Sequence, residues 1–237
     1  MIAAIVVNKG IDKRLGKKLK KLLGADFLDS PHFTLAMTHR SVSGKRNNER
    51  MEFLGDSILG VVITEALFYR LPDASEGYLS RLRASLVNES VLAEISHELD
   101  LGESLRLGSG ELKSGGARRS SILADALEAL IAAVFLEHDM AKAKSFVLQL
   151  FATRLAALPT EDELKDPKSR LQEYLQSRGH ALPVYQLIST TGDAHRQTFT
   201  TECRIDSLQI VTQGVSTSRR KAEQLSADKA FQQVTSK

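Results

Sequence analysis

Two long apolar segments of this chain carry acidic residues at helical spacing. The first begins ERMEFLGDSILGVVIT at residue 49, stops before Pro72, and carries Glu65 as its only charge between residues 57 and 69. The second, SSILADALEALIAAVFL from residue 120, has Asp125 and Glu128 as its only charges. Segments this long and this apolar predict two helices that pack together inside a helical domain.

The acids that open the first segment share one helical face, since Glu49, Glu52 and Asp56 are spaced i, i+3, i+7. Such acids usually belong to a solvated face, but here they border apolar helices, and burying an unpaired carboxylate costs several kcal/mol. Neither apolar stretch contains a base, although Arg50 and Arg119 lie nearby in the sequence. Carboxylates without a histidine or cysteine cluster favour Mg²⁺, or Mn²⁺ as a substitute, over Zn²⁺. We therefore predict a shared metal site formed by Glu52, Asp56, Asp125 and Glu128, with Glu49 at its edge or capping the helix.

The remainder of the first two-thirds of the chain is also predicted to be helical. Between Ser30 and Ala157 no β-type alternation occurs. Ser30 followed by Pro31 predicts a helix start with the serine as N-cap, and Gly102 is expected to end a helix. The stretch LGSGELKSGGARRS predicts a loop before the second apolar helix.

The periodicity changes beyond LPTEDELKDP (158–167), whose prolines and charges predict a domain linker. PKSRLQEYLQSRG predicts a short helix, and the Thr-, Val- and Ile-rich segment after it predicts three antiparallel strands. TSRRKAEQLSADKAFQQV predicts a closing helix, whose first turn holds Arg219, Arg220 and Lys221. These bases oppose the helix dipole and would favour a bound phosphate. A merely solvated basic helix is the alternative.

Charge is unevenly distributed along the chain. Residues 166–237 contain 10 Lys and Arg against 7 Asp and Glu, whereas residues 1–165 contain 22 of each sign. Within that first part, KGIDKRLGKKLKK (9–21) holds seven bases against one acid. This distribution predicts a polyanionic partner bound at the ends of the chain, although solvated basic termini would give the same pattern.

A single cysteine, Cys203, excludes an intrachain disulfide and favours a reducing, cytoplasmic compartment. We expect this thiol to be packed in a strand. The opening MIAAIVVNKG has no basic residue before its apolar run and no small-residue cleavage site, so we interpret it as a leading strand or tail. No stretch approaches the roughly 18 to 20 apolar residues of a membrane span, so no membrane partner is expected.

ERMEFLGDS resembles the signature of the ribonuclease III family, with Met51 where leucine is commoner. THRS (38–41), LGSGELKSGG and RRSSILADALEALIAAVFL are similar to further segments of that family in the same order. The resemblance extends from about residue 22 to the C-terminus and is to the short bacterial type. It implies an all-α nuclease domain, a ribonuclease III-like helical bundle (17–157), then a linker (158–166). A small α+β domain of α-β-β-β-α order (167–237), which binds double-stranded RNA, would follow.

The resemblance also implies roles for individual residues. It identifies Glu52, Asp56, Asp125 and Glu128 as ligands of catalytic Mg²⁺, with Asp56 and Glu128 as catalytic residues, and Glu49 and Glu76 as auxiliary acids. The residues expected to contact RNA are Gln172, Glu173, His195, Ser218, Arg219, Arg220 and Lys221. Phe53 is expected to enter the partner subunit of a homodimer, although apolar helices also bury phenylalanine within their own chain.

The implied activity is hydrolysis of phosphodiester bonds in double-stranded RNA, with ribosomal RNA precursors and structured messenger RNAs as substrates. Bound Mg²⁺ lowers the pKa of a water and stabilises charge on the departing 3′ oxygen, so His39 and His138 are interpreted as structural. Products would carry 5′-phosphate and 3′-hydroxyl ends with short 3′ overhangs. Two hypotheses compete with this nuclease. A non-catalytic RNA-binding protein would leave the four acids unexplained, and a metal-dependent nucleotide hydrolase would leave the predicted RNA-binding domain unexplained.

Overall fold

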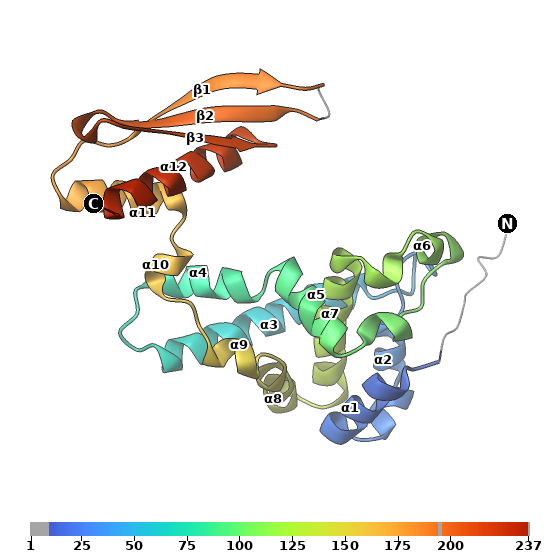
Figure 1. Cartoon of the computed structure of the whole chain (residues 1–237). Helices are drawn as coiled ribbons and strands as arrows, with labels where there is room; N and C mark the ends of the chain where they lie inside the picture. Colours follow the sequence, from blue (N-terminus) through green and yellow to red (C-terminus); the bar gives the residue numbers. More distant parts are fainter. Residues whose placement is uncertain (1–9, 194–195, 237) are drawn as a thin grey trace. The chain divides into compact units, whose positions relative to one another are not determined.

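A computed structural model of the chain describes residues 10–193 and 196–236. It divides into two compact units, Met1–Leu158 and Pro159–Lys237. The strand or tail predicted for the start of the chain falls on residues 1–9, outside the described residues. Figure 1 shows the elements of both units.

The first unit is built from helices, as the sequence predicted, and Thr38 and Arg106 form an isolated β-bridge in its described part. Its α-helices are α1 (Lys13–Leu23), α2 (Pro31–Ala36), α3 (Glu49–Arg70), α4 (Glu76–Leu86), α5 (Glu89–Glu98), α6 (Ser109–Lys113), α7 (Ser120–Glu137), α8 (Met140–Leu150) and α9 (Ala152–Ala156). Short 3₁₀ turns lie at η1 (Asp26–Asp29), η2 (Leu101–Ser104) and η3 (Gly116–Arg118).

Helices α3 and α7 form the centre of this unit, and α2, α5 and α8 pack against α7 (Figure 1). Most of α7 is buried from Ile122 to Val134, so it requires apolar residues nearly all the way round. Gly55 allows α3 to approach α7 closely, because a Cβ at this position would overlap the backbone carbonyl of Glu128. The two apolar segments therefore meet directly, as predicted.

The helix ends are fixed by local hydrogen bonds, with one difference from expectation. Ser30 caps α2, its Oγ accepting the N–H of Phe33 at 3.0 Å. Helix α5 ends at Glu98, before Gly102, which was expected to end it, and Asp100 takes the left-handed conformation with φ 60°. Gly102 instead lies within η2, where a Cβ would overlap the carbonyl of Ala117.

The second unit has α10 (Glu161–Leu164), α11 (Pro167–Ser177), β1 (Val184–Thr191), β2 (Thr198–Ile205), η4 (Asp206–Leu208), β3 (Ile210–Ser216) and α12 (Arg219–Thr235). The strands form one antiparallel sheet in the order β1-β2-β3. The α-β-β-β-α order and the three strands are thus confirmed. The segment predicted as a linker contains α10, which begins with a capping box between Thr160 and Glu163.

Helices α11 and α12 cover one face of this sheet (Figure 1). Leu171 and Leu175 of α11 and Ala227 and Ala230 of α12 pack with the buried thiol of Cys203, which is confirmed as a core residue. Gly214 of β3 lies so close to α12 that a Cβ would overlap the Ala222 carbonyl. This packing fixes the start of α12 beside the sheet edge. No helix of the described residues has the length and apolarity to cross a membrane.

Candidate metal centre

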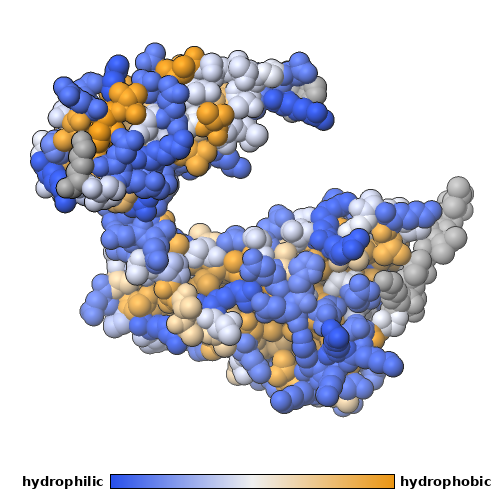
Figure 2. All heavy atoms as spheres, in the orientation of Figure 1, coloured by the Kyte–Doolittle hydropathy of each residue, from blue (hydrophilic) through white to orange (hydrophobic). Residues whose placement is uncertain are grey.

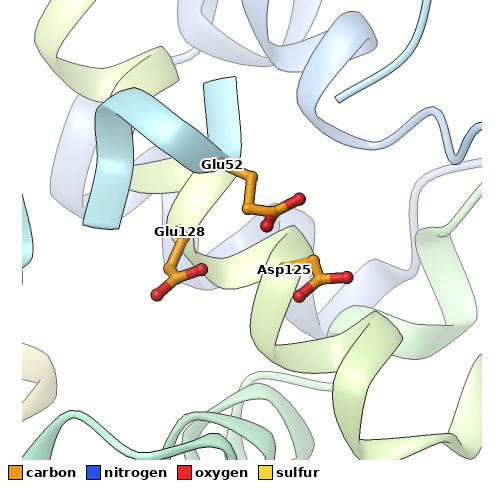
Figure 3. A group of neighbouring side chains, drawn as sticks. All are labelled: Glu52, Asp125 and Glu128. Atoms are coloured by element: carbon orange, nitrogen blue, oxygen red, sulfur yellow. The ribbon is translucent and has the colours of Figure 1, made fainter. Parts of the chain in front are cut away.

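Three of the predicted acids converge in the first unit. Glu52 extends from α3, while Asp125 and Glu128 extend from successive turns of α7, and the three carboxylates point toward a common space (Figure 3). One oxygen of each can be chosen so that all three lie within 4.8 Å of one another. The close approach at Gly55 produces this arrangement, because it brings the start of α3 against the middle of α7.

Asp56 lies one turn after Glu52 on α3 and is exposed, and its carboxylate is not within that group of three. It is nevertheless near enough for its charge to be the second-largest cause, after burial, of the raised pKa of Glu128. Glu52 and Asp56 thus extend from adjacent turns of α3, but only Glu52 belongs to the group of three.

The electrostatics of the cluster disfavour three negative charges. Burial, followed by the charges of Asp56, Glu52 and Asp125, raises the pKa of Glu128 to about 8. Burial is also the main cause of the raised pKa of Glu52, with the Asp125 charge second. The pKa of Asp125 is raised by burial too, although His39 opposes the shift. Arg40 also lowers the pKa of Glu52 and of Asp125, but it does not outweigh the effect of burial, so all three carboxylates keep raised pKa values.

This donor set fits a hard divalent cation. Within residues 10–193 and 196–236, none of the three carboxylates forms an ion pair. Oxygen ligands without histidine or cysteine are those of Mg²⁺ and Mn²⁺. A bound dication would lower the raised pKa values of the three carboxylates and would keep all three ionised.

A polar hollow adjoins the cluster and is lined by Glu49, Glu52, Asp125 and residues that the sequence did not assign to the site: His39, Arg40, Asn48, Glu111, Arg119, Ser121 and Ile122. Glu49 lines this hollow outside the group of three acids and pairs with Arg40 at 3.4 Å. Glu111 is held by Arg119 at 2.6 Å. Glu111 lies within LGSGELKSGG, a segment that resembles the ribonuclease III family. That resemblance could have pointed to Glu111, but the segment was interpreted only as a loop.

The two histidines have different surroundings. His138 stacks on Phe27 with ring centroids 6.0 Å apart, as a structural residue would. His39 instead lines the polar hollow, and its Nδ1 lies 2.8 Å from the Ser41 hydroxyl. Burial lowers the pKa of His39 and so favours a neutral ring beside the acids.

Two further predicted residues lie outside the cluster. Glu76 begins α4, accepts a hydrogen bond from the Ser80 hydroxyl at 2.7 Å, and lines a separate hollow with Arg83. Phe53 is 77% exposed on α3, so burial within its own chain, the alternative for this residue, does not occur.

The residues predicted to contact RNA lie on the surface of the second unit, except that His195 falls outside the described residues. Ser218 caps α12, its Oγ accepting the Lys221 N–H at 3.3 Å. Arg220 and Lys221 are exposed, and Arg219 pairs with Glu223 at 3.0 Å. On α11, Gln172 is exposed, while Glu173 accepts a hydrogen bond from Lys165 at 2.7 Å.

Family comparisons agree with both units. Residues 29–155 match the family described as Ribonuclease-III-like, and residues 167–234 match the Double-stranded RNA binding motif. The chain belongs to the ribonuclease III family. Similar proteins include "Ribonuclease 3" of Vibrio parahaemolyticus, 51% identical over 229 residues that cover 97% of this chain and 99% of that protein. "Ribonuclease 3" of Hahella chejuensis is 53% identical over 215 residues, 91% of this chain and 95% of that protein.

A solved structure supports the assignment of the first unit to the ribonuclease III fold. The nuclease domain of ribonuclease III from Campylobacter jejuni aligns with a TM-score of 0.56 and 41% identity, over 60% of this chain and 99% of that domain. The resemblance stated from the sequence is thereby confirmed, as is the order of a helical unit of the ribonuclease III fold followed by a unit that matches the Double-stranded RNA binding motif.

Proposed function

We propose that this protein is an endoribonuclease that hydrolyses phosphodiester bonds in double-stranded RNA and depends on Mg²⁺ held by carboxylates. The observation that carries the proposal is the convergence of Glu52, Asp125 and Glu128 within 4.8 Å at the junction of α3 and α7. Membership of the ribonuclease III family supports the activity, and the donor chemistry supports the metal.

In the proposed mechanism, Glu52, Asp125 and Glu128 hold the ion and Asp56 contributes from the adjacent turn of α3. Mg²⁺ bound there would supply a water nucleophile of lowered pKa and would stabilise charge on the departing 3′ oxygen. Glu128 has to lose its proton to act as a ligand, which its pKa of about 8 in the metal-free site resists. Products would carry 5′-phosphate and 3′-hydroxyl ends with short 3′ overhangs.

The second unit would hold the duplex. Domains with a double-stranded RNA binding motif read A-form shape largely without sequence, and the exposed Arg220 and Lys221 at the start of α12 suit phosphates. Gln172, Glu173 and Ser218 are proposed as further contacts, together with His195. Ribosomal RNA precursors and structured messenger RNAs are the proposed substrates. Work in the cytoplasm would suit the unpaired, buried thiol of Cys203.

The proposal is tested by titrating Mg²⁺ into the full chain with a plain RNA duplex of about 40 base pairs, more than twice the roughly 16 that one such domain covers. We expect no cutting of the duplex in EDTA and a rate of cutting that saturates as Mg²⁺ is added. Neither strand should be cut when it is supplied alone. Gel analysis of product ends checks the polarity. Binding of the duplex with no cutting at any Mg²⁺ or Mn²⁺ concentration would favour the rival hypothesis, a non-catalytic RNA-binding protein.

We further propose that the nuclease unit forms a homodimer through α3. Phe53, Val61 and Phe68 are 77%, 58% and 61% exposed along one face of that helix, and such apolar faces usually meet a partner. The nuclease domain from Campylobacter jejuni has a structurally flexible region involved in dimer formation, which supports a dimer of the same unit here.

Sedimentation analysis tests the dimer. Phe53→Glu should convert the protein to a monomer, because it would bury a charge at the interface. Leu182→Glu, which alters a 51% exposed apolar residue of the second unit, should leave the dimer intact. A parent protein that sediments as a monomer would contradict this proposal.

A further inference from the structure

Helix α1 presents a band of positive charge that the proposed catalytic site does not use. Six of its basic side chains are exposed: Lys13, Arg14, Lys17, Lys18, Lys20 and Lys21. The opposite face is buried, with Leu15 and Leu19 at 0% exposure. In Figure 2, hydrophilic residues predominate at the lower right of the first unit, where Figure 1 places α1.

These charges are not neutralised within the described part of the chain, where none of the six forms an ion pair. The one acid among residues 9–21, Asp12, uses its carboxylate to accept the N–H groups of Arg14 at 2.7 Å and Leu15 at 3.1 Å as the N-cap of α1. Glu98 lies beside the helix, but its carboxylate pairs with Arg154 at 2.8 Å, and only its backbone carbonyl accepts a hydrogen bond from Lys18.

The arrangement is unfavourable for the helix alone. Lys13, Lys17 and Lys21 follow one another at i, i+4 spacing, and each like-charged pair of this kind destabilises a helix by about 0.2–0.5 kcal/mol. Lys13 and Arg14 also oppose the helix dipole in the first turn, although Lys20 and Lys21 complement it in the last turn. Phosphate groups along the band would remove the repulsion.

The band is rigidly held and is flanked by hollows. Asp12 donates its N–H to the Ser104 hydroxyl at 2.9 Å, which ties the start of α1 to η2. One hollow is lined by Lys13, Lys17 and Lys20 together with Asp12 and Asp29, and another, beside α5 and α8, by Lys18 and Lys21 together with Glu98. The bases therefore stand on a fixed ridge between two grooves, and a loose basic terminus would offer no such surface.

We propose that α1 binds the phosphate backbone of the duplex RNA substrate, at a surface separate from the carboxylate cluster. This inference rests on the proposed function, in which double-stranded RNA is the polyanionic substrate. An anionic membrane suits the surface less well, because a helix that lies on a membrane inserts an apolar face, and that face of α1 is occupied by the protein core. From Lys13 to Lys21 the band spans about 12 Å, enough for a few phosphates.

The test compares three full-length variants, two that each lose two positive charges and one that keeps the parental charge. Lys17→Gln/Lys21→Gln removes two charges from the band with little change in helix propensity. Lys142→Gln/Lys144→Gln removes two charges from α8, and Lys17→Arg/Lys21→Arg keeps the charge of the band. Binding of a duplex of about 40 base pairs is measured in EDTA, without cutting, as the salt concentration is varied.

For Lys17→Gln/Lys21→Gln we expect the slope of log Kd against log salt to fall by about 1 to 2, since each neutralised phosphate contributes about 0.9. Affinity near 0.1 M salt should weaken by about tenfold or more. The α8 variant and the arginine variant should match the parent. Equal slopes in the parent and the three variants would overturn the proposal. Binding to phosphatidylserine vesicles is measured in parallel. If Lys17→Gln/Lys21→Gln weakened vesicle binding but not duplex binding, the proposal would also be overturned. Because binding is read without cutting, failure of the nuclease assignment would appear separately in the Mg²⁺ titration.

Discussion

Glu128→Gln should reduce the rate of duplex RNA cutting by about 10³-fold or more while duplex binding in EDTA stays within about twofold of the parent. Glu128 is the acid whose ionisation is most disfavoured without a cation, and we propose that it holds the catalytic ion. Loss of several kcal/mol of metal-based stabilisation of the transition state corresponds to about three orders of magnitude in rate. Single-turnover cutting and filter binding measure the two quantities.

The matched control is Glu65→Gln, which removes a carboxylate from α3 that pairs with Lys144 at 2.7 Å outside the cluster. We expect it to cut at the parental rate. A variant with the opposite behaviour, Arg220→Gln/Lys221→Gln, should weaken binding and leave cutting at saturating RNA nearly unchanged. If Glu128→Gln cut the duplex at the parental rate, the proposal that Glu128 holds the catalytic ion would be wrong.

Loss of cutting in Glu128→Gln should not come from unfolding. Because the pKa of Glu128 in the folded metal-free protein lies above the ordinary 4.5, the associated stability is present below pH 4.5 and is lost as pH rises toward 8. In EDTA, the parent should therefore lose more stability between pH 5 and 8 than the variant does. The difference is expected to be on the order of 1 kcal/mol, given solvent screening of this half-buried group. Urea denaturation at the two pH values measures it.

Gly55→Ala should destabilise the nuclease unit by about 3 kcal/mol and abolish cutting. The added Cβ would overlap the carbonyl oxygen and carbon of Glu128, and both are backbone atoms of a buried helix that cannot rotate away. Separation of α3 from α7 would also separate Glu52 from Glu128, so the damage reaches the site directly. Urea denaturation gives the free energy of unfolding.

Gly110→Ala provides the control, because this glycine lies in α6 and an added Cβ meets no atom within 4 Å. Alanine favours a helix over glycine by about 1 kcal/mol, so the control should be as stable as the parent or slightly more so. If Gly55→Ala had parental stability and activity, the close contact of the two helices would not be what forms the site.

The sequence predicted best those features that depend on local patterns. The long helix α3 spans Glu49–Arg70, as predicted, because Glu65 is the only charge in its apolar run and Pro72 prevents its continuation. The three strands follow from β-branched runs separated by turn residues. The faces that carry Glu52, Asp125 and Glu128 follow from helical spacing once two apolar helices are expected to pack together.

Features set by tertiary contacts were not accessible in the same way. The pairing of Glu111 with Arg119 depends on how a loop folds back beside α7. Asp56 shares its helix face with Glu52, yet its side chain remains exposed, which spacing alone does not determine. Asp100 and not Gly102 adopts the left-handed conformation, because Gly102 is needed where the chain approaches Ala117. The helix α10 had a visible signal, TEDE at residues 160–163, which the charged composition of the segment obscured.

Direct measurement of Mn²⁺ binding by electron paramagnetic resonance, in the parent and in Glu128→Gln, tests most closely whether acids from α3 and α7 together hold a hard dication. Ligands have to be deprotonated, so parental affinity should rise with pH until about 8 and then level off. We expect Glu128→Gln to bind at least about tenfold more weakly and to lose most of this pH dependence. Equal affinities in the two proteins, or no binding by the parent, would contradict a shared metal site.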